Sequence, residues 1–197
     1  DGKTPLHYAA IRGDLLCVNV NVVANLLENG AQVDARDKDG KTPLHYAAIR
    51  GDLLGVNVNV VANLLENGAQ VDARDKEEKT PLHYAAMVED DKVVAHLLEK
   101  GAQVDARDKD EKTALHYAAM KGHAVVVVHL LQKGAQVDAK DKDDKAALEL
   151  ATYAMRGDIV ELLQDAIDRE SYESRPHTSQ TPETGIGELL ACMAGGT

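Results

Sequence analysis

The sequence predicts an all-α solenoid, a stack of helix-turn-helix units in which each unit packs only against its neighbours. The block DGKTPLHYAA and its variants begin at Asp1, Asp39, Glu77, Asp110 and Asp143, so successive starts lie 38, 38, 33 and 33 residues apart. Each block is followed by an apolar segment that closes in Leu-Leu, and in the first four units Gly-Ala-Gln-Val-Asp-Ala comes next. Self-similarity at such a period is typical of repeat solenoids.

The local chemistry of the first unit predicts its elements in order. Thr4 suits the N-cap, and Pro5 the first position, of a helix that covers LHYAAI. Gly13 ends this helix, and Asp14 caps a second one. Gly30 ends the second helix in a left-handed conformation. The segment AQVDARDKDGK follows as an extended, charged connector with turn residues at its tip.

The composition is consistent with thin, closely packed helices and excludes several kinds of partner. The chain has 197 residues, no Trp, no Phe and six Tyr, so its core must come from Leu, Val, Ile and Ala. A net charge of −11 argues against binding nucleic acid or an anionic membrane surface. No apolar run approaches the length of a membrane-spanning helix. Cys17 and Cys192 lie far apart without a motif, which favours a reducing compartment and a cytoplasmic location.

The motifs DGKTPLHYAA and LLENGAQVDARDK together resemble the ankyrin repeat, over about Asp1 to Asp165 and in five units. The resemblance implies antiparallel helix pairs with β-hairpin fingers that project at right angles. Arrays of this family usually bind proteins through the fingers and through the concave face of the first helices. The phrase LLENGAQVDARDKDGKTPLHYAA is also similar to arrays from intracellular bacteria.

The repeat frame predicts an ankyrin array over residues 1–169 and a tail over residues 170–197, which combines a polar linker with the short apolar stretch IGELLACMAGG. In the fifth unit Glu149 replaces His and Leu150 replaces Tyr, and two extra residues precede Gly157, so we interpret this unit as a C-terminal cap. The first unit lacks a preceding finger and a polar cap, which suggests a truncated array that could self-associate. The expected units span about 1–36, 37–74, 75–107, 108–140 and 141–169.

The first two units carry the nearly identical segments LLCVNVNVVANLL (15–27) and LLGVNVNVVANLL (53–65), which are five residues longer than their later equivalents. The central VNVNV alternates like a strand, but a period of 3.6 places most apolar side chains on one arc. We therefore predict one helix from about Asp14 to Asn29, lengthened by roughly 1.4 turns. The polar Asn19 and its copy Asn57 fall on the apolar arc and would each need a hydrogen-bond partner. The extension is either a special contact surface or a tolerated elongation copied by duplication.

Two columns of side chains recur in the first helices. His7, His45, His83 and His116 share one position without nearby metal ligands, and the family resemblance implies that this His ties neighbouring units together through local hydrogen bonds. The Tyr residues that directly follow them are expected to pack between helices with the hydroxyl at a polar edge, the alternative being a binding hot spot. They are Tyr8, Tyr46, Tyr84 and Tyr117.

The resemblance places the candidate partner-binding residues on the concave face and at the fingers. The two positions after each Ala-Ala pair are expected to face the groove, where Ile and Met would form an apolar line suited to protein partners. The alternative for the repeated Lys-Asp pairs is a merely solvated rim. The groove candidates are Ile11, Arg12, Ile49, Arg50, Met87, Val88, Met120 and Lys121, and the finger candidates are Lys38, Asp39, Lys41, Lys76, Glu77, Lys79, Lys109, Asp110 and Lys112.

No motif for a nucleophile, a phosphate-binding loop or a metal centre occurs, so we expect no catalysis, no metal and no cofactor in the array. The leading hypothesis is a protein–protein interaction scaffold with an unidentified protein partner. The alternative is the targeting arm of a larger bacterial effector or enzyme, delivered into a host cell, whose activity lies outside these residues.

Overall fold

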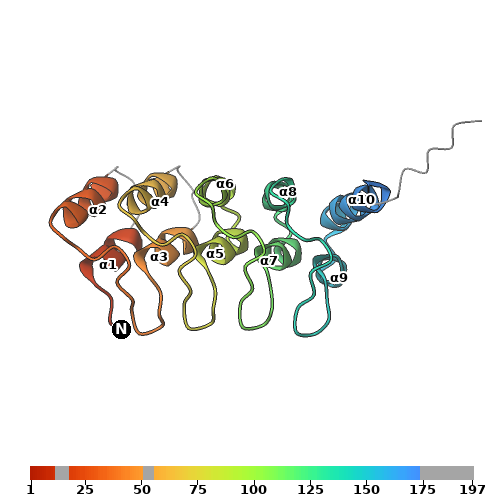
Figure 1. Cartoon of the computed structure of the whole chain (residues 1–197), viewed down its shortest axis with the longest axis horizontal. Coiled ribbons are helices and arrows are strands. Elements are labelled where there is room, and N and C mark those ends of the chain that lie inside the picture. The colour runs from red at the N-terminus through yellow and green to blue at the C-terminus, as the bar shows by residue number, and fades with distance from the viewer. Residues whose placement is uncertain (12–17, 51–55, 174–197) are drawn as a thin grey trace, which may run out of the picture.

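The computed structural model describes residues 1–11, 18–50 and 56–173 of the 197-residue chain. These residues contain ten helices and no β-strand. Figure 1 shows two rows of helices, with the first helix of each pair in one row and the second in the other. The pairs, in chain order, are α1 (Pro5–Ile11) with α2 (Val18–Glu28), α3 (Pro43–Ile49) with α4 (Val56–Glu66), α5 (Pro81–Met87) with α6 (Asp91–Glu99), α7 (Ala114–Lys121) with α8 (Ala124–Gln132), and α9 (Ala147–Tyr153) with α10 (Gly157–Glu173).

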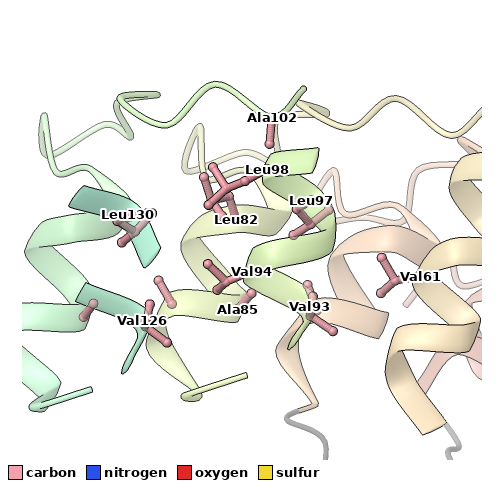
Figure 2. Close-up of a cluster of buried hydrophobic side chains, with 14 of the residues drawn as sticks. Val61, Leu82, Ala85, Val93, Val94, Leu97, Leu98, Ala102, Val126 and Leu130 are labelled. Carbon is pink, nitrogen blue, oxygen red and sulfur yellow. The ribbon is translucent and has the colours of Figure 1, made fainter. Parts of the chain in front are cut away.

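Contacts join each helix pair to its sequence neighbours, as expected for a solenoid. The first helices follow one another in the order α1, α3, α5, α7 and α9, and the second helices do the same from α2 to α10. Between them lies a continuous core of small apolar side chains, part of which Figure 2 shows around Leu82, Val94 and Leu97. The paired alanines of the first helices, such as Ala85 and Ala86, are fully buried, which lets neighbouring helices approach closely.

The helix ends follow the predicted capping chemistry. Thr42 occupies the N-cap of α3 in an extended conformation, and Pro43 follows at the first helical position. Gly30 ends α2 with a φ of 83°, and its amide donates to the Leu27 carbonyl oxygen at 2.9 Å. The next amide, of Ala31, donates to the Leu26 carbonyl oxygen at 2.9 Å, which completes a Schellman motif. The same positive φ recurs at the equivalent glycines of the next three units, so this prediction is confirmed.

The segment VNVNV is helical in both of its copies, as predicted, because α2 and α4 begin at Val18 and Val56. The helix end predicted at about Asn29 agrees with the observed end at Glu28 within one residue. The predicted start at Asp14 and the side chains of Asn19 and Asn57 lie outside the described residues. The two helices contact each other, so the repeated segments do lie side by side.

The fifth unit contains no insertion before Gly157, although the sequence predicts two extra residues there, so this prediction is wrong. The Arg156 amide donates to the Ala151 carbonyl oxygen at 2.9 Å, just as the His123 amide donates to the Ala118 carbonyl oxygen at 3.0 Å, 33 residues earlier. Met155 therefore occupies the left-handed turn position of Gly122, with a φ of 56° against 85°. An alignment on glycines alone predicts an insertion because the turn residue here is Met155, and Gly157 follows two residues later.

A candidate protein-binding surface

The buried histidines form the most regular link between units. In α3 the His45 Nδ1 accepts a hydrogen bond from the Thr42 amide at 3.1 Å. Because Nδ1 accepts, the ring proton lies on Nε2, which donates to the Lys79 carbonyl oxygen in the next unit at 3.0 Å. His7, His83 and His116 make the same pair of contacts. The predicted role of this histidine in tying units together is confirmed.

Burial determines the protonation of three of these rings. The desolvation of the charged form lowers the pKa of His45, His83 and His116, and it outweighs the hydrogen bonds to the lysine carbonyls that act in the other direction. The neutral ring is therefore the form that fits the fold. In the fifth unit Glu149 stands in this position, and its Oε2 accepts from the Ala146 amide at 2.7 Å.

Tyr46, Tyr84 and Tyr117 pack with the hydroxyl on an aspartate, which confirms the structural interpretation for these three, whereas Tyr8 in the first unit is exposed. The Tyr117 hydroxyl donates to Asp108 Oδ2 at 2.5 Å, and Tyr46 and Tyr84 contact Asp37 and Asp75 in the same way. Burial raises the pKa of Tyr117 well above its ordinary value, and the hydrogen bond to the carboxylate adds to this effect.

The same aspartates close the fingers. Asp108 Oδ1 accepts hydrogen bonds from the Asp110 amide at 2.9 Å and from the Lys112 amide at 3.0 Å. Burial acts to raise the pKa of Asp108, but the hydrogen bonds from Tyr117 and from these amides outweigh it and hold the pKa below its ordinary value. Figure 1 shows the resulting fingers as a row of loops that extend beyond the first helices.

Neighbouring finger tips contact one another. The Lys109 amide donates to the Glu77 carbonyl oxygen at 3.0 Å, and their side chains lie 3.8 Å apart as an ion pair. The Lys76 amide makes the equivalent bond to Asp39 at 2.9 Å. The Lys142 side chain pairs in the same way with Asp110 at 3.6 Å. The candidate residues at the tips are therefore brought together in pairs.

The lysines at the base of the fingers are partly buried and engaged between units. Lys79 Nζ lies 3.3 Å from Asp108 Oδ2 in the next unit, and Lys112 Nζ lies 3.3 Å from Asp141 Oδ2. Lys41 Nζ instead stands 5.0 Å from the centroid of the Tyr84 ring. Such pairs of lysine with a buried partner support the stack, so these lysines are less available to a partner than their sequence pattern suggests.

The expected apolar line of Ile11, Ile49, Met87 and Met120 is partly exposed along the row of first helices. Beside it, Val88 is also partly exposed, and Lys121 is exposed. Arg50 is exposed too, and its guanidinium donates to the Ile11 carbonyl oxygen. Arg12 lies outside the described residues. A face with apolar side chains flanked by cations can bury part of its surface against another protein.

Sequence reasoning missed a further link between the units, although a repeated Arg in VDAR signalled it. The Arg74 guanidinium donates to the Arg107 carbonyl oxygen at 2.8 Å, and Arg107 donates to the Lys140 carbonyl oxygen at the same distance. Aspartates of the same motif accept from the next unit, as Asp72 does from the Gln103 amide at 3.0 Å. The sequence analysis also did not identify the exposed Tyr153 and Met155 at the end of the array.

Two further properties concern only the part of the chain that the structure describes. Within it, no group of three or more His, Cys, Asp or Glu side chains is arranged to hold a metal ion. No helix in these ranges is both long enough and apolar enough to cross a membrane.

A cleft of about 400 Å³ lies between α8 and α10. Its lining residues are Val128, Leu131, Gln132, Leu162, Ala166, Arg169 and Glu170.

The helix pairs are similar from unit to unit, and the same histidine contact joins each of the first four to the next. They define a helical repeat solenoid, a class of fold that presents a long surface to other proteins. A model of the family described as ankyrin repeats (3 copies) matches residues 15–108 and 82–172. These matches cover more than half of the 197 residues, so the chain belongs to the ankyrin repeat family. A comparison with curated proteins found no match. Ankyrin repeats are generally protein-interaction modules, and proteins built from them are typically non-enzymatic.

Proposed function

We propose that this array binds a partner protein through the face formed by its first helices and its fingers. The observation that carries the proposal is the partly exposed line of Ile49, Met87 and Met120, which continues from unit to unit. Most other large apolar side chains of the first helices, such as Leu44 and Leu82, are fully buried. Apolar side chains that remain accessible on a rigid surface gain free energy when a partner covers them.

The exposed cations beside this line, Arg50 and Lys121, would set the orientation of the partner more than its affinity. The finger tips would add polar contacts at the rim, where the ion pair of Lys109 with Glu77 is open to solvent. Binding would thus combine apolar anchors on the helices with charged contacts on the fingers.

The fifth unit supports a further part of the proposal, that it is the C-terminal cap of an array that spans about residues 1–169. Glu149 and Leu150 stand where other units have His and Tyr, so this unit lacks the imidazole that donates to a following unit. Its second helix, α10, is 17 residues long and carries exposed polar residues such as Asp165 and Asp168. A polar outer face is what a terminal repeat needs for solubility.

The test is a pull-down of the natural partner by the wild-type chain and by an Ile49→Glu/Met87→Glu variant. We expect the double variant to lose most of the recovered partner while it keeps the helical circular dichroism of the wild type. The matched control is Val22→Glu/Val125→Glu, which places the same charges on exposed valines of the second helices. Equal recovery by a folded double variant and the wild type would rule out the proposed face.

A further inference from the structure

The last two helix pairs leave an open cleft between α8 and α10, in the row of second helices. Its apolar side chains are partly exposed, and they are Val128 and Leu131 of α8 and Leu162 and Ala166 of α10. Its volume of about 400 Å³ lies within the range of about 300–1,000 Å³ that is typical of binding pockets. The first helices, which carry the proposed partner-binding face, form the other row (Figure 1). The cleft therefore belongs to a separate surface.

Part of the cleft results from a substitution that is specific to the fifth unit. The buried Leu163 aligns with the buried Leu130, 33 residues earlier, so Leu162 stands where the fourth unit has His129. The first three units also carry a polar side chain at this position, namely Asn25, Asn63 and His96. The leucine adds apolar surface where the earlier units have polar groups.

The rest of the α10 side of the cleft comes from an extension of this helix. α10 has 17 residues, whereas α8 has 9. Asp165 aligns with Gln132, the last residue of α8, so the lining residues Ala166, Arg169 and Glu170 lie beyond the length of the repeat. Together with Leu162 they are spaced at i, i+4, i+7 and i+8, which places all four on one face of α10. The leucine and the longer helix of the fifth unit thus build one side of the cleft.

The sequence after α10 contains a segment with the pattern that such a cleft accepts. Its large apolar residues are Ile186, Leu189, Leu190 and Met193. They occur at i, i+3, i+4 and i+7, the spacing of the anchor residues when an amphipathic helix lies in a groove. On a helical wheel this pattern occupies an arc of about 100°. The remaining arc takes the small or polar residues Gly187, Glu188, Ala191 and Cys192.

The connection between α10 and this segment has a suitable length. α10 ends at Glu173, about 10 Å along the helix axis from Ala166. The twelve residues 174–185 lead from there to Ile186. A flexible chain of that length has an r.m.s. end-to-end distance of about 20 Å. The effective concentration of the segment at the cleft is then on the order of 1 mM, so a contact that is weak between separate molecules is mostly formed within one chain.

We propose that the segment 186–193 docks into the cleft between α8 and α10. Its apolar stripe packs on Val128, Leu131 and Leu162, while Arg169 and Glu170 form a polar rim. Glu188 and Cys192 lie on the solvent side of the docked segment. The chain itself then covers this apolar surface, which is not a second site for the partner protein.

The test places a nitroxide spin label on Cys192 of the full chain in a Cys17→Gly background. Gly55 stands at the position of Cys17 in the second unit, so the background uses a residue that the repeat already contains. We expect paramagnetic broadening of the methyl resonances of Val128, Leu131 and Leu162 that does not change on dilution. The methyl resonances of Val22, in α2 at the other end of the array, should stay sharp.

Leu190→Asp and Ala191→Asp form a matched pair, because the two residues are adjacent but belong to opposite arcs of the pattern. Leu190→Asp should remove the broadening, whereas Ala191→Asp should keep most of it. On the other side of the contact, Leu162→His introduces the side chain that the fourth unit has at this position and should reduce the broadening. Circular dichroism checks that each variant keeps the helical content of the wild type.

A peptide of residues 185–194 measures the same contact between separate molecules. Added to the full-length Leu190→Asp chain, it should shift the methyl resonances of Val128, Leu131 and Leu162 with a Kd of about 0.1 mM. At an effective concentration of about 1 mM, this affinity corresponds to about nine docked molecules in ten.

Three results would overturn the proposal. The first is sharp methyl resonances at the cleft in the labelled chain, or the same broadening with Leu190→Asp. The second is broadening that disappears on dilution, which would assign the cleft to the segment of a second copy. The third is a peptide Kd above about 10 mM, because the effective concentration could not then keep the segment docked. Failure of the partner-binding face shows separately, in the pull-down with Ile49→Glu/Met87→Glu, which leaves the cleft unchanged.

Discussion

His83 Nε2 lies 3.0 Å from the carbonyl oxygen of Lys112, a residue of the next unit. The other ring nitrogen of His83 accepts from the Thr80 amide at 3.0 Å. One fully buried side chain therefore fixes the start of its own helix and the position of the following finger.

Replacing His83 by Ala should lower the free energy of unfolding by about 3 kcal/mol, because it leaves the Thr80 amide and the Lys112 carbonyl oxygen without their partners in a buried region. Urea titration followed by circular dichroism measures this change. The control is Lys92→Ala at an exposed position of α6, which should stay within about 0.5 kcal/mol of the wild type. A loss of less than 0.5 kcal/mol for His83→Ala would contradict the structural role.

Stability should fall as the pH drops through the ordinary pKa of histidine, about 6.5. Burial lowers the pKa of His45, His83 and His116 in the folded chain, so below this pH the unfolded chain binds protons that the folded chain does not. For each of these histidines the free energy of unfolding falls by up to about 1.4 kcal/mol per pH unit, until the pH reaches the pKa of that histidine in the folded chain. Urea midpoints measured between pH 7.5 and pH 5 should therefore decrease with acidification.

The matched control for this pH dependence is His83→Gln, whose side chain can still accept from the Thr80 amide but does not titrate. The variant should be less stable at pH 7.5, but its free energy of unfolding should fall less steeply on acidification. The difference between the two slopes should correspond to about one bound proton. A slope equal to that of the wild type would show that His83 is not protected from protonation in the fold.

The local features of the fold could be predicted because their causes lie within one unit. Thr42 and Pro43 start a helix, and Gly30 ends one, through contacts between residues that are close in sequence. The helical state of VNVNV also followed from its period of 3.6. The face with Ile49 and Met87 came from the family resemblance, and its binding role stays a prediction.

The contacts between units could not be predicted in the same way, because they depend on the geometry of the stack. Arg74 reaches a carbonyl oxygen 33 residues later, and nothing in the residues around Arg74 specifies that distance. The family resemblance places Lys79 among the candidate partner-binding residues, and only the stack shows that its ammonium group pairs with Asp108 of the next unit. The turn at Met155 is hard to align from sequence because a left-handed residue is usually glycine.

Tyr117→Phe should lower the free energy of unfolding by about 1.5 kcal/mol, because it removes the 2.5 Å hydrogen bond to the buried Asp108 carboxylate. The matched control is Tyr8→Phe in the first unit. The Tyr8 hydroxyl donates to Asp1, a different position of the repeat, at 2.8 Å, and Tyr8 is 44% exposed, against 7% for Tyr117, so water can replace the lost partner. The control should change stability by less than about 0.5 kcal/mol, and equal effects of the two variants would contradict the argument from burial.

Met155→Gly should raise the free energy of unfolding by about 0.5–1 kcal/mol, because glycine adopts the left-handed conformation at this turn without the steric cost that a Cβ imposes. The exposed Met side chain has little packing to lose. The matched control is Ala154→Gly next to it, where the φ of −80° is an ordinary helical value and glycine should destabilise by a similar amount. Thermal and urea unfolding of the two variants measure the difference. Destabilisation by Met155→Gly would contradict this argument and show that the Met side chain supports the fold.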